Sequence, residues 1–223
     1  MRWVTRSIIR TLATVAVVAV VAAVGWSVVH QLTTTIPISI VAPTVTVPAA
    51  AQANGQLRTV HTPGTLVADI QLTAGECHYR PVNAARGGVL PDPACTPGAV
   101  DPAVTQANIQ QTICHRGYTS TVRPAWGLTA PFKLISYSAY GSSHSATTEL
   151  DHLVPLEVGG ASSASNLWVE PNAQSAHTVD NPKDLVEGAL NRAVCQGRVP
   201  LAAAQQAIAT NWITALHQLG LSG

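Results

Sequence analysis

The chain begins with an apolar segment that is long enough to cross a membrane. Residues 11–32 are almost uncharged, and a helix of that length spans a hydrocarbon core of about 30 Å. Arg2, Arg6 and Arg10 precede the segment, so the positive-inside rule predicts a cytoplasmic N-terminus and an extracellular remainder. We therefore expect residues 1–32 to form a single-pass anchor in the cell membrane.

A cleaved signal peptide is the alternative for this segment. Ala51 and Ala53 flank Gln52 in the small-x-small pattern of a cleavage site. The pattern lies far beyond the apolar run, which favours the uncleaved anchor. Cleavage would instead release a secreted protein.

Prolines recur through the next segment, residues 33–73, which is also rich in Thr, Val, Ala and Gln. Such a composition disfavours helix and predicts a semi-stiff extended linker. The stretch from Thr59 to Leu72 could instead form a strand. We expect one folded domain after the linker, over residues 74–223.

The hydrophobic pattern after residue 74 predicts loops first and helices later. Turn-forming residues dominate 77–102, where we expect no helix. An acidic cap and a proline predict a helix from Asp101 to Cys114. Two more helices are predicted by apolar spacing and end signals: Thr129–Tyr140, with Phe132, Ile135 and Ala139 on one face and Gly141 at its end, and Lys183–Cys195. The pattern repeats over Ala202–Leu219.

Between these helices, residues 149–171 predict a β-hairpin. An apolar run contains Asp151 and His152, a Gly159-Gly160 turn and a small polar loop follow, and Asn166 precedes Leu167 and Trp168. Two short strands around a loop fit this pattern. We expect Trp168 to anchor the core rather than to stack on a base.

Charge and cysteine content limit the function and the compartment. A net charge of +1 with 10% charged residues provides no strong positive field, which excludes tight sequence-specific DNA binding. Four cysteines follow the apolar segment, which indicates two disulfides in an oxidising compartment. Three pairings are possible, and we favour Cys77–Cys95 with Cys114–Cys195. Free thiols are the alternative, and zinc binding is disfavoured because no Cys-x-x-Cys pair is present.

The stretch Glu-Leu-Asp-His-Leu-Val-Pro-Leu-Glu-Val-Gly-Gly, followed by Asn-Leu-Trp, resembles the HNH endonucleases. The resemblance extends over about Cys77–Trp212 and is closest to secreted or membrane-anchored actinobacterial HNH-like proteins. It implies an α+β fold: a small, disulfide-pinned domain whose ββα-metal core, about residues 148–195, is flanked by helices. In that family, one divalent cation lies between hairpin and helix.

Phosphodiester hydrolysis needs a base for the attacking water and a cation for the charge that develops on the phosphate. The resemblance assigns Asp151 to the metal and His152 to the general base. Neighbouring strand residues point to opposite faces, which suits separate roles. An ordinary histidine pKa of about 6.5 also leaves His152 largely neutral at physiological pH. Asn166 is expected to fix the loop geometry or to orient the histidine.

The remaining metal ligand is open at this stage. His177 is the candidate from the wider family, whereas Asn181, Lys183 or Asp184 would supply the third function, or a phosphate contact, in the narrower subgroup. The cation could be magnesium, manganese, zinc or nickel. A lone Asp-His pair can also be purely structural.

These features together predict a metal-dependent endonuclease of low sequence specificity that acts outside the cytoplasm. Its partners would be nucleic acid, bound weakly through the backbone, and the membrane, through the N-terminal helix. The alternative is a surface binding or structural module that keeps the scaffold without hydrolysis. A hydrolase of cell-wall polymers is disfavoured because no paired-carboxylate motif is visible.

Overall fold

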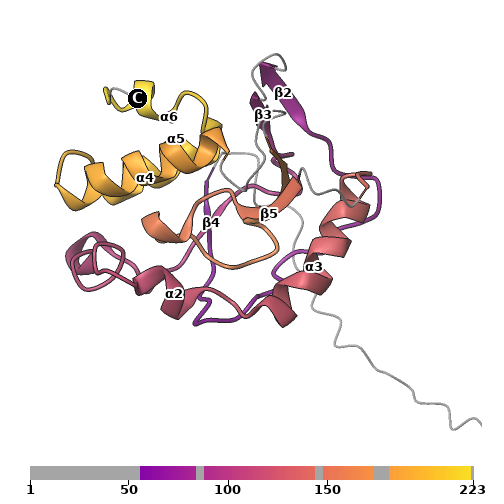
Figure 1. Cartoon of the computed structure of the whole chain (residues 1–223), viewed down its shortest axis with the longest axis horizontal. Helices are drawn as coiled ribbons and strands as arrows, with labels where there is room; N and C mark the ends of the chain where they lie inside the picture. Colours follow the sequence, from indigo (N-terminus) through magenta and orange to yellow (C-terminus); the bar gives the residue numbers. More distant parts are fainter. Residues whose placement is uncertain (1–55, 84–87, 144–147, 173–180, 222–223) are drawn as a thin grey trace, which may run out of the picture. The chain divides into compact units, whose positions relative to one another are not determined.

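The computed structural model describes residues 56–83, 88–143, 148–172 and 181–221, which form a small mixed α and β domain (Figure 1). The predicted anchor at 1–32 and the linker up to residue 55 lie outside the described residues. Within the described ranges, no helix is both long and apolar enough to cross a membrane.

The strands of the described residues are short and pair two by two. The three ladders are parallel β1 (Arg58–Thr59) with β4 (Ala99–Val100), antiparallel β2 (Arg80–Asn83) with β3 (Gly88–Leu90), and antiparallel β5 (Thr148–His152) with β6 (Leu167–Pro171).

Helices occupy the middle and the C-terminal part of the domain. They are η2 (Gln106–Asn108), α2 (Tyr118–Val122), α3 (Trp126–Ala139), η3 (Leu156–Val158), α4 (Pro182–Cys195), α5 (Leu201–Asn211) and α6 (Ala215–Gln218), of which η2 and η3 are 3₁₀ turns.

The predicted hairpin forms between β5 and β6. Asp151 pairs with Trp168 and His152 pairs with Leu167, so both candidate site residues lie at the loop end of the ladder. Trp168 is fully buried, as expected for a core anchor. The strands therefore place the Asp-His pair next to the loop that Asn166 closes.

Helix α4 agrees with the prediction, and its start is well determined by sequence. Asn181 caps the helix by accepting a hydrogen bond from the Lys183 backbone N–H, and Asp184 closes the capping box. Pro182 occupies the first turn, where its missing N–H costs nothing.

The predicted single helix over Ala202–Leu219 is wrong, because it breaks into α5 and α6. The Asn211 side chain accepts a hydrogen bond from the Ile213 backbone N–H. That local bond offers the backbone an alternative to the helical ladder. The chain therefore turns after α5.

Helix α3 begins three residues earlier than predicted and has a different inner face. Phe132 and Ala139 are buried as expected, but Ile135 is half exposed and Ser136 and Tyr137 face the core instead. Gly141 follows the helix with a φ of 57° and thus ends it as predicted.

The predicted helix from Asp101 to Cys114 is also wrong, since only η2 and irregular turns form there. The Asp101 carboxylate accepts hydrogen bonds from His61 and from the backbone and hydroxyl of Thr62. These partners lie far away in sequence, and the carboxylate also accepts a local hydrogen bond from the Ala103 backbone N–H, so Asp101 joins two distant segments without starting a helix. The absence of helix over 77–102 is confirmed for the described residues, although β2, β3 and β4 cross that stretch.

Residues 58–72, placed in the linker by composition, are part of the domain. Thr62 is buried, Val67 forms a bridge with Ser163, and Asp69 accepts hydrogen bonds from the backbone and hydroxyl of Ser165. The polar side chains of this segment accept hydrogen bonds from the backbone and side chains of the hairpin loop. The folded domain therefore begins well before residue 74.

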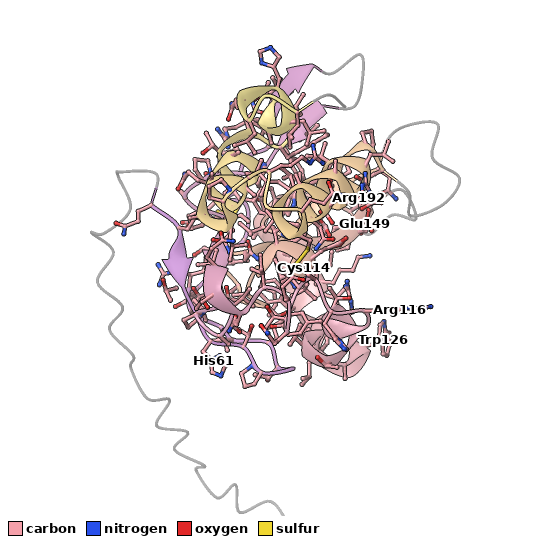
Figure 2. All side chains as sticks on the ribbon, turned by 90° about the vertical axis from the view of Figure 1, so that its left-hand side faces the viewer. His61, Cys114, Arg116, Trp126, Glu149 and Arg192 are labelled. Carbon is pink, nitrogen blue, oxygen red and sulfur yellow. A yellow bond between two sulfur atoms is a disulfide. The ribbon has the colours of Figure 1, made fainter. Side chains whose placement is uncertain are left out.

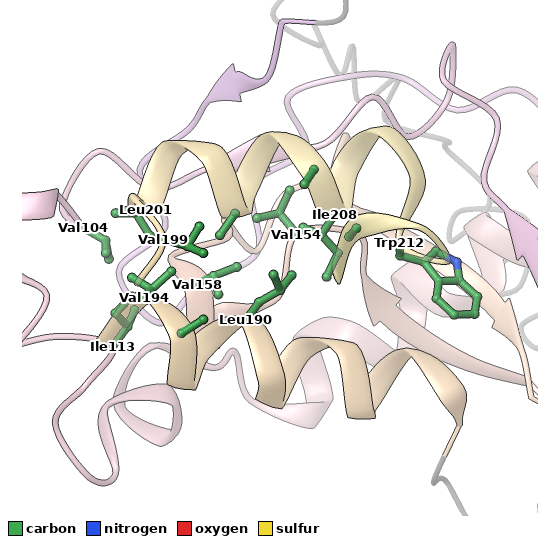
Figure 3. Close-up of a cluster of buried hydrophobic side chains, with 14 of the residues drawn as sticks. Val104, Ile113, Val154, Val158, Leu190, Val194, Val199, Leu201, Ile208 and Trp212 are labelled. Carbon is green, nitrogen blue, oxygen red and sulfur yellow. The ribbon is translucent and has the colours of Figure 1, made fainter. Parts of the chain in front are cut away.

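The main apolar core lies between α4 and α5 (Figure 3). Leu190 and Val194 of α4 meet Leu201 and Ile208 of α5, and Val158 of the hairpin loop packs between the helices. A second cluster surrounds Trp168 and includes Tyr137 of α3. The hairpin loop is thus held by both helices.

Both favoured disulfides are present. Cys77 pairs with Cys95, and Cys114 pairs with Cys195. The second bond ties the segment before α2 to the end of α4, across 81 positions of sequence. Every cysteine of the chain is therefore oxidised.

Candidate functional site

A fully buried lysine occupies the space between the hairpin and α4. The Lys183 ammonium donates hydrogen bonds to Asp151 Oδ2 at 2.5 Å, to the His152 carbonyl at 2.7 Å and to Glu187 Oε1. Glu170 Oε2 lies 3.9 Å from the same nitrogen. One ammonium group therefore forms ion pairs with three carboxyl groups, one each from β5, β6 and α4.

Burial and the Lys183 charge act in opposite directions on the carboxyl groups of this cluster. Burial raises the pKa of Glu187 to about 8 and that of Glu170 well above its ordinary value. Burial also opposes the charged form of Asp151, but the Lys183 ammonium outweighs it and lowers the pKa of that carboxyl. The Lys183–Asp151 pair therefore keeps its charges, whereas burial favours the neutral forms of the two glutamic acids.

His152 points to the other face of β5, as the strand geometry predicts. Its side chain is buried, and its Nε2 lies 3.0 Å from the Ser162 hydroxyl. Burial lowers the pKa of His152 to about 4, and the Asp151 carboxylate only partly opposes this shift. The imidazole is therefore neutral at physiological pH.

A pocket of about 250 Å³ opens beside His152. Its walls come from the segment before α3, from α3 and from both hairpin strands: Arg123, Pro124, Trp126, Thr129, Leu150 and Leu167. Arg123 acts with Lys183 in lowering the pKa of His152, after the larger effect of burial. The histidine is thus reached from a pocket that carries an exposed cation.

The contact between His152 and Ser162 does not make an acyl-transfer dyad. Ser162 is fully buried, and its backbone N–H donates to the Thr62 hydroxyl in the interior. A nucleophilic serine must reach its substrate. The hydroxyl therefore holds the imidazole in place.

Asn166 supports the loop and makes no hydrogen bond to His152. Its side-chain oxygen accepts from the backbone N–H groups of Ala99 and Val154, and its amide donates to the carbonyls of Val154 and Ala161. Of the two expected roles, the geometry favours fixing the loop.

The residues predicted for the remaining metal ligand or a phosphate contact divide between the Lys183 cluster and the cap of α4. Asn181 uses its oxygen for the α4 cap and donates its amide to Glu149 Oε1 at 2.5 Å. Asp184 closes the cap, and Lys183 is in the cluster. Asn181 and Asp184 thus serve to position α4 against the hairpin.

The described residues do not make a metal centre on their own. No three His, Cys, Asp or Glu side chains are grouped to hold an ion in the parts of the chain that the structure describes. Asp151 is engaged by Lys183, and His177 lies outside the described residues. The donor set therefore does not fit a divalent ion without His177 or another donor from 173–180.

Sequence analysis missed the roles of Arg123, Trp126 and Ser162. No local sequence signal links these three residues to His152, which they approach only in the folded domain. Glu187 follows Lys183 by four positions on a helix, a spacing that does indicate an ion pair.

Comparison of the chain with protein-family models, with curated proteins and with solved structures found no match.

Proposed function

We propose that the protein is an HNH-like endonuclease that hydrolyses phosphodiester bonds of nucleic acid with low sequence specificity outside the cytoplasm. The observation that carries the proposal is the placement of His152, a neutral imidazole that lines a pocket with Arg123. The hairpin followed by a helix is the element order of the ββα core that the motif implies. Two disulfides support an oxidising compartment.

In this function, His152 accepts the proton of the attacking water. A pKa of about 4 makes the free imidazole a weak base. A phosphate bound beside Arg123 adds negative charge next to the ring, which raises the pKa of His152 toward the range that suits a general base. Ser162 keeps the ring oriented during the transfer.

A divalent cation belongs to the proposal, with Asp151 and His177 as the residues that would hold it. It would supply neutralisation of charge on the phosphate and on the leaving oxygen. Lys183 stabilises the charge of Asp151 in its absence.

A cleavage assay tests the proposal. The full chain, purified in a mild detergent, is incubated with plasmid DNA and with RNA in magnesium, manganese, nickel, zinc or EDTA. We expect cleavage with at least one metal, and a loss of about a hundredfold or more in His152→Ala. Cleavage by His152→Ala at the rate of the parent would refute the assignment of the base.

A module without hydrolytic activity is the second candidate, and the Lys183 cluster favours it. The ammonium already neutralises Asp151, so the site is electrostatically complete without a metal. Calorimetry separates the two functions: the nuclease should bind a divalent ion and lose affinity in Asp151→Asn. Absence of binding for every metal tested would favour the module.

A further inference from the structure

Three exposed arginines have side chains without a partner. In the part of the chain that the structure describes, Arg116, Arg123 and Arg192 make no side-chain hydrogen bond or ion pair. The other described arginines are engaged by neighbours: Arg58 by Asp69, Arg80 by the Pro91 carbonyl and Arg198 by Gln196. The three free guanidinium groups are available to a ligand.

These arginines line two hollows on either side of α2. Arg116 and Arg192 border a hollow of about 430 Å³ next to the Cys114–Cys195 disulfide. Arg123 follows the end of α2 and borders the His152 pocket. In Figure 2, Arg192, Arg116 and Trp126 follow one edge of the domain, from α4 to the start of α3. A ligand along this edge would meet positive charge on its way to His152.

An exposed tryptophan stands where this edge reaches the His152 pocket. Trp126 is 81% exposed, and it borders both that pocket and an apolar hollow of about 580 Å³ along α3. An indole left in water costs free energy, whereas an unpaired base can stack on its face. In a duplex the bases are already stacked on one another, so this surface favours single strands.

Burial raises the pKa of two acidic groups on the same face. Burial is the main cause that raises the pKa of Glu157, which borders the first hollow, and it raises the pKa of Glu149 to about 7. The Arg123 guanidinium opposes the rise in the pKa of Glu157, so its positive charge acts at the first hollow as well as in the His152 pocket.

We propose that the two hollows form one binding track for single-stranded nucleic acid that leads to His152. Phosphates contact the three free arginines, and one unpaired base stacks on Trp126. The track deepens the proposed nuclease function by naming its substrate class, and it rests on that function for the meaning of His152.

Binding without turnover tests the track. Fluorescence anisotropy measures the affinity of the full chain, in EDTA, for labelled oligothymidylate and oligouridylate of about ten nucleotides and for a duplex of the same length. We expect both single strands to bind more tightly than the duplex. Trp126→Ala should weaken their binding about tenfold. Arg123→Gln should lower the slope of log affinity against log salt by about 0.7, the value for one phosphate contact on a single strand.

Matched variants control for general effects. Arg80→Gln removes the same charge from β2, and Ile135→Ala truncates an exposed apolar side chain of α3 outside these hollows; both should bind like the parent. Equal affinity for duplex and single strand, or parent-like binding by Trp126→Ala and Arg123→Gln, would overturn the track. Trp126-dependent binding without any cleavage in the plasmid and RNA assay would keep the track and overturn the nuclease. Cleavage by the parent without Trp126-dependent binding would keep the nuclease and overturn the track.

Discussion

Lys183 is a buried cation that neutralises the carboxyl groups around it. Its ammonium is fully buried against Asp151 and Glu187, and three carboxyl groups raise its pKa above the ordinary value even though burial opposes this. A lysine of this kind stays charged and couples the hairpin to α4. The folding role of the cluster can be separated from any catalytic role.

Lys183→Met should destabilise the domain by about 3 to 5 kcal/mol, because Asp151, whose side chain is 20% exposed, and the buried Glu187 would remain without their cation. Urea unfolding of the full chain, followed by circular dichroism, measures the change. Lys133→Met is the control, since Lys133 is partly exposed and bonds to a single carbonyl; we expect a change below about 1 kcal/mol. Equal losses in both variants would contradict the role of the cluster.

His152 should make the domain sensitive to acid. Its pKa in the folded protein, about 4, lies below the ordinary value of 6.5, so folding favours the neutral ring. The stabilisation is complete above pH 6.5 and is lost as the pH falls toward 4, by roughly 3 kcal/mol. Glu187 has the opposite sign: its raised pKa makes the domain lose stability as the pH rises from 4.5 to about 8.

The contribution of His152 is therefore measured as a difference. We expect the stability gap between the parent and His152→Gln to shrink as the pH is lowered from 7 to 4, in urea titrations at each pH. A gap that is independent of pH would show that the histidine is not held neutral by burial.

At the scale of elements, the hairpin loop depends on Asn166. Asn166→Asp replaces the side-chain amide nitrogen, which donates to the carbonyls of Val154 and Ala161, by an oxygen that cannot donate. The free energy of unfolding should fall by about 2 to 4 kcal/mol. Asn108→Asp is the matched control, because Asn108 is only partly buried and donates to one carbonyl; its cost should stay within about 1 kcal/mol. Similar midpoints in urea for both variants would contradict the supporting role of Asn166.

Elements with strong local signals were predictable from sequence. The β5–β6 hairpin and α4 follow from alternation, turn glycines and a capping box. The irregular segment at 101–114 and the break after α5 could not be predicted in this way. Hydrogen bonds from distant residues to Asp101 decide the first, and a hydrogen bond that the Asn211 side chain accepts from the Ile213 N–H decides the second. Asp151 and His152 were found from their motif, whereas the pocket with Arg123 and Trp126 exists only once α3 packs beside the hairpin.

At the scale of the molecule, the two disulfides should stabilise the domain unequally. Cys114–Cys195 closes a separation of 81 positions and Cys77–Cys95 closes 18. In the chain-entropy picture, the longer loop contributes about 1 kcal/mol more. We expect the Cys114→Ser/Cys195→Ser variant to unfold at lower urea than Cys77→Ser/Cys95→Ser. The reverse order would show that native-state packing, rather than loop closure, dominates.

The proposed nuclease depends on His152 as the base that activates water in the pocket that Arg123 borders. The most direct measurement is the rate at which the full chain cleaves a labelled single-stranded oligonucleotide, compared among the parent, His152→Ala, Arg123→Gln and the control Arg80→Gln, in each metal and in EDTA. We predict cleavage by the parent and by Arg80→Gln, slower cleavage by Arg123→Gln, and a loss of about a hundredfold or more in His152→Ala. Equal rates for the parent and His152→Ala, or no cleavage by the parent in any metal, would contradict the account.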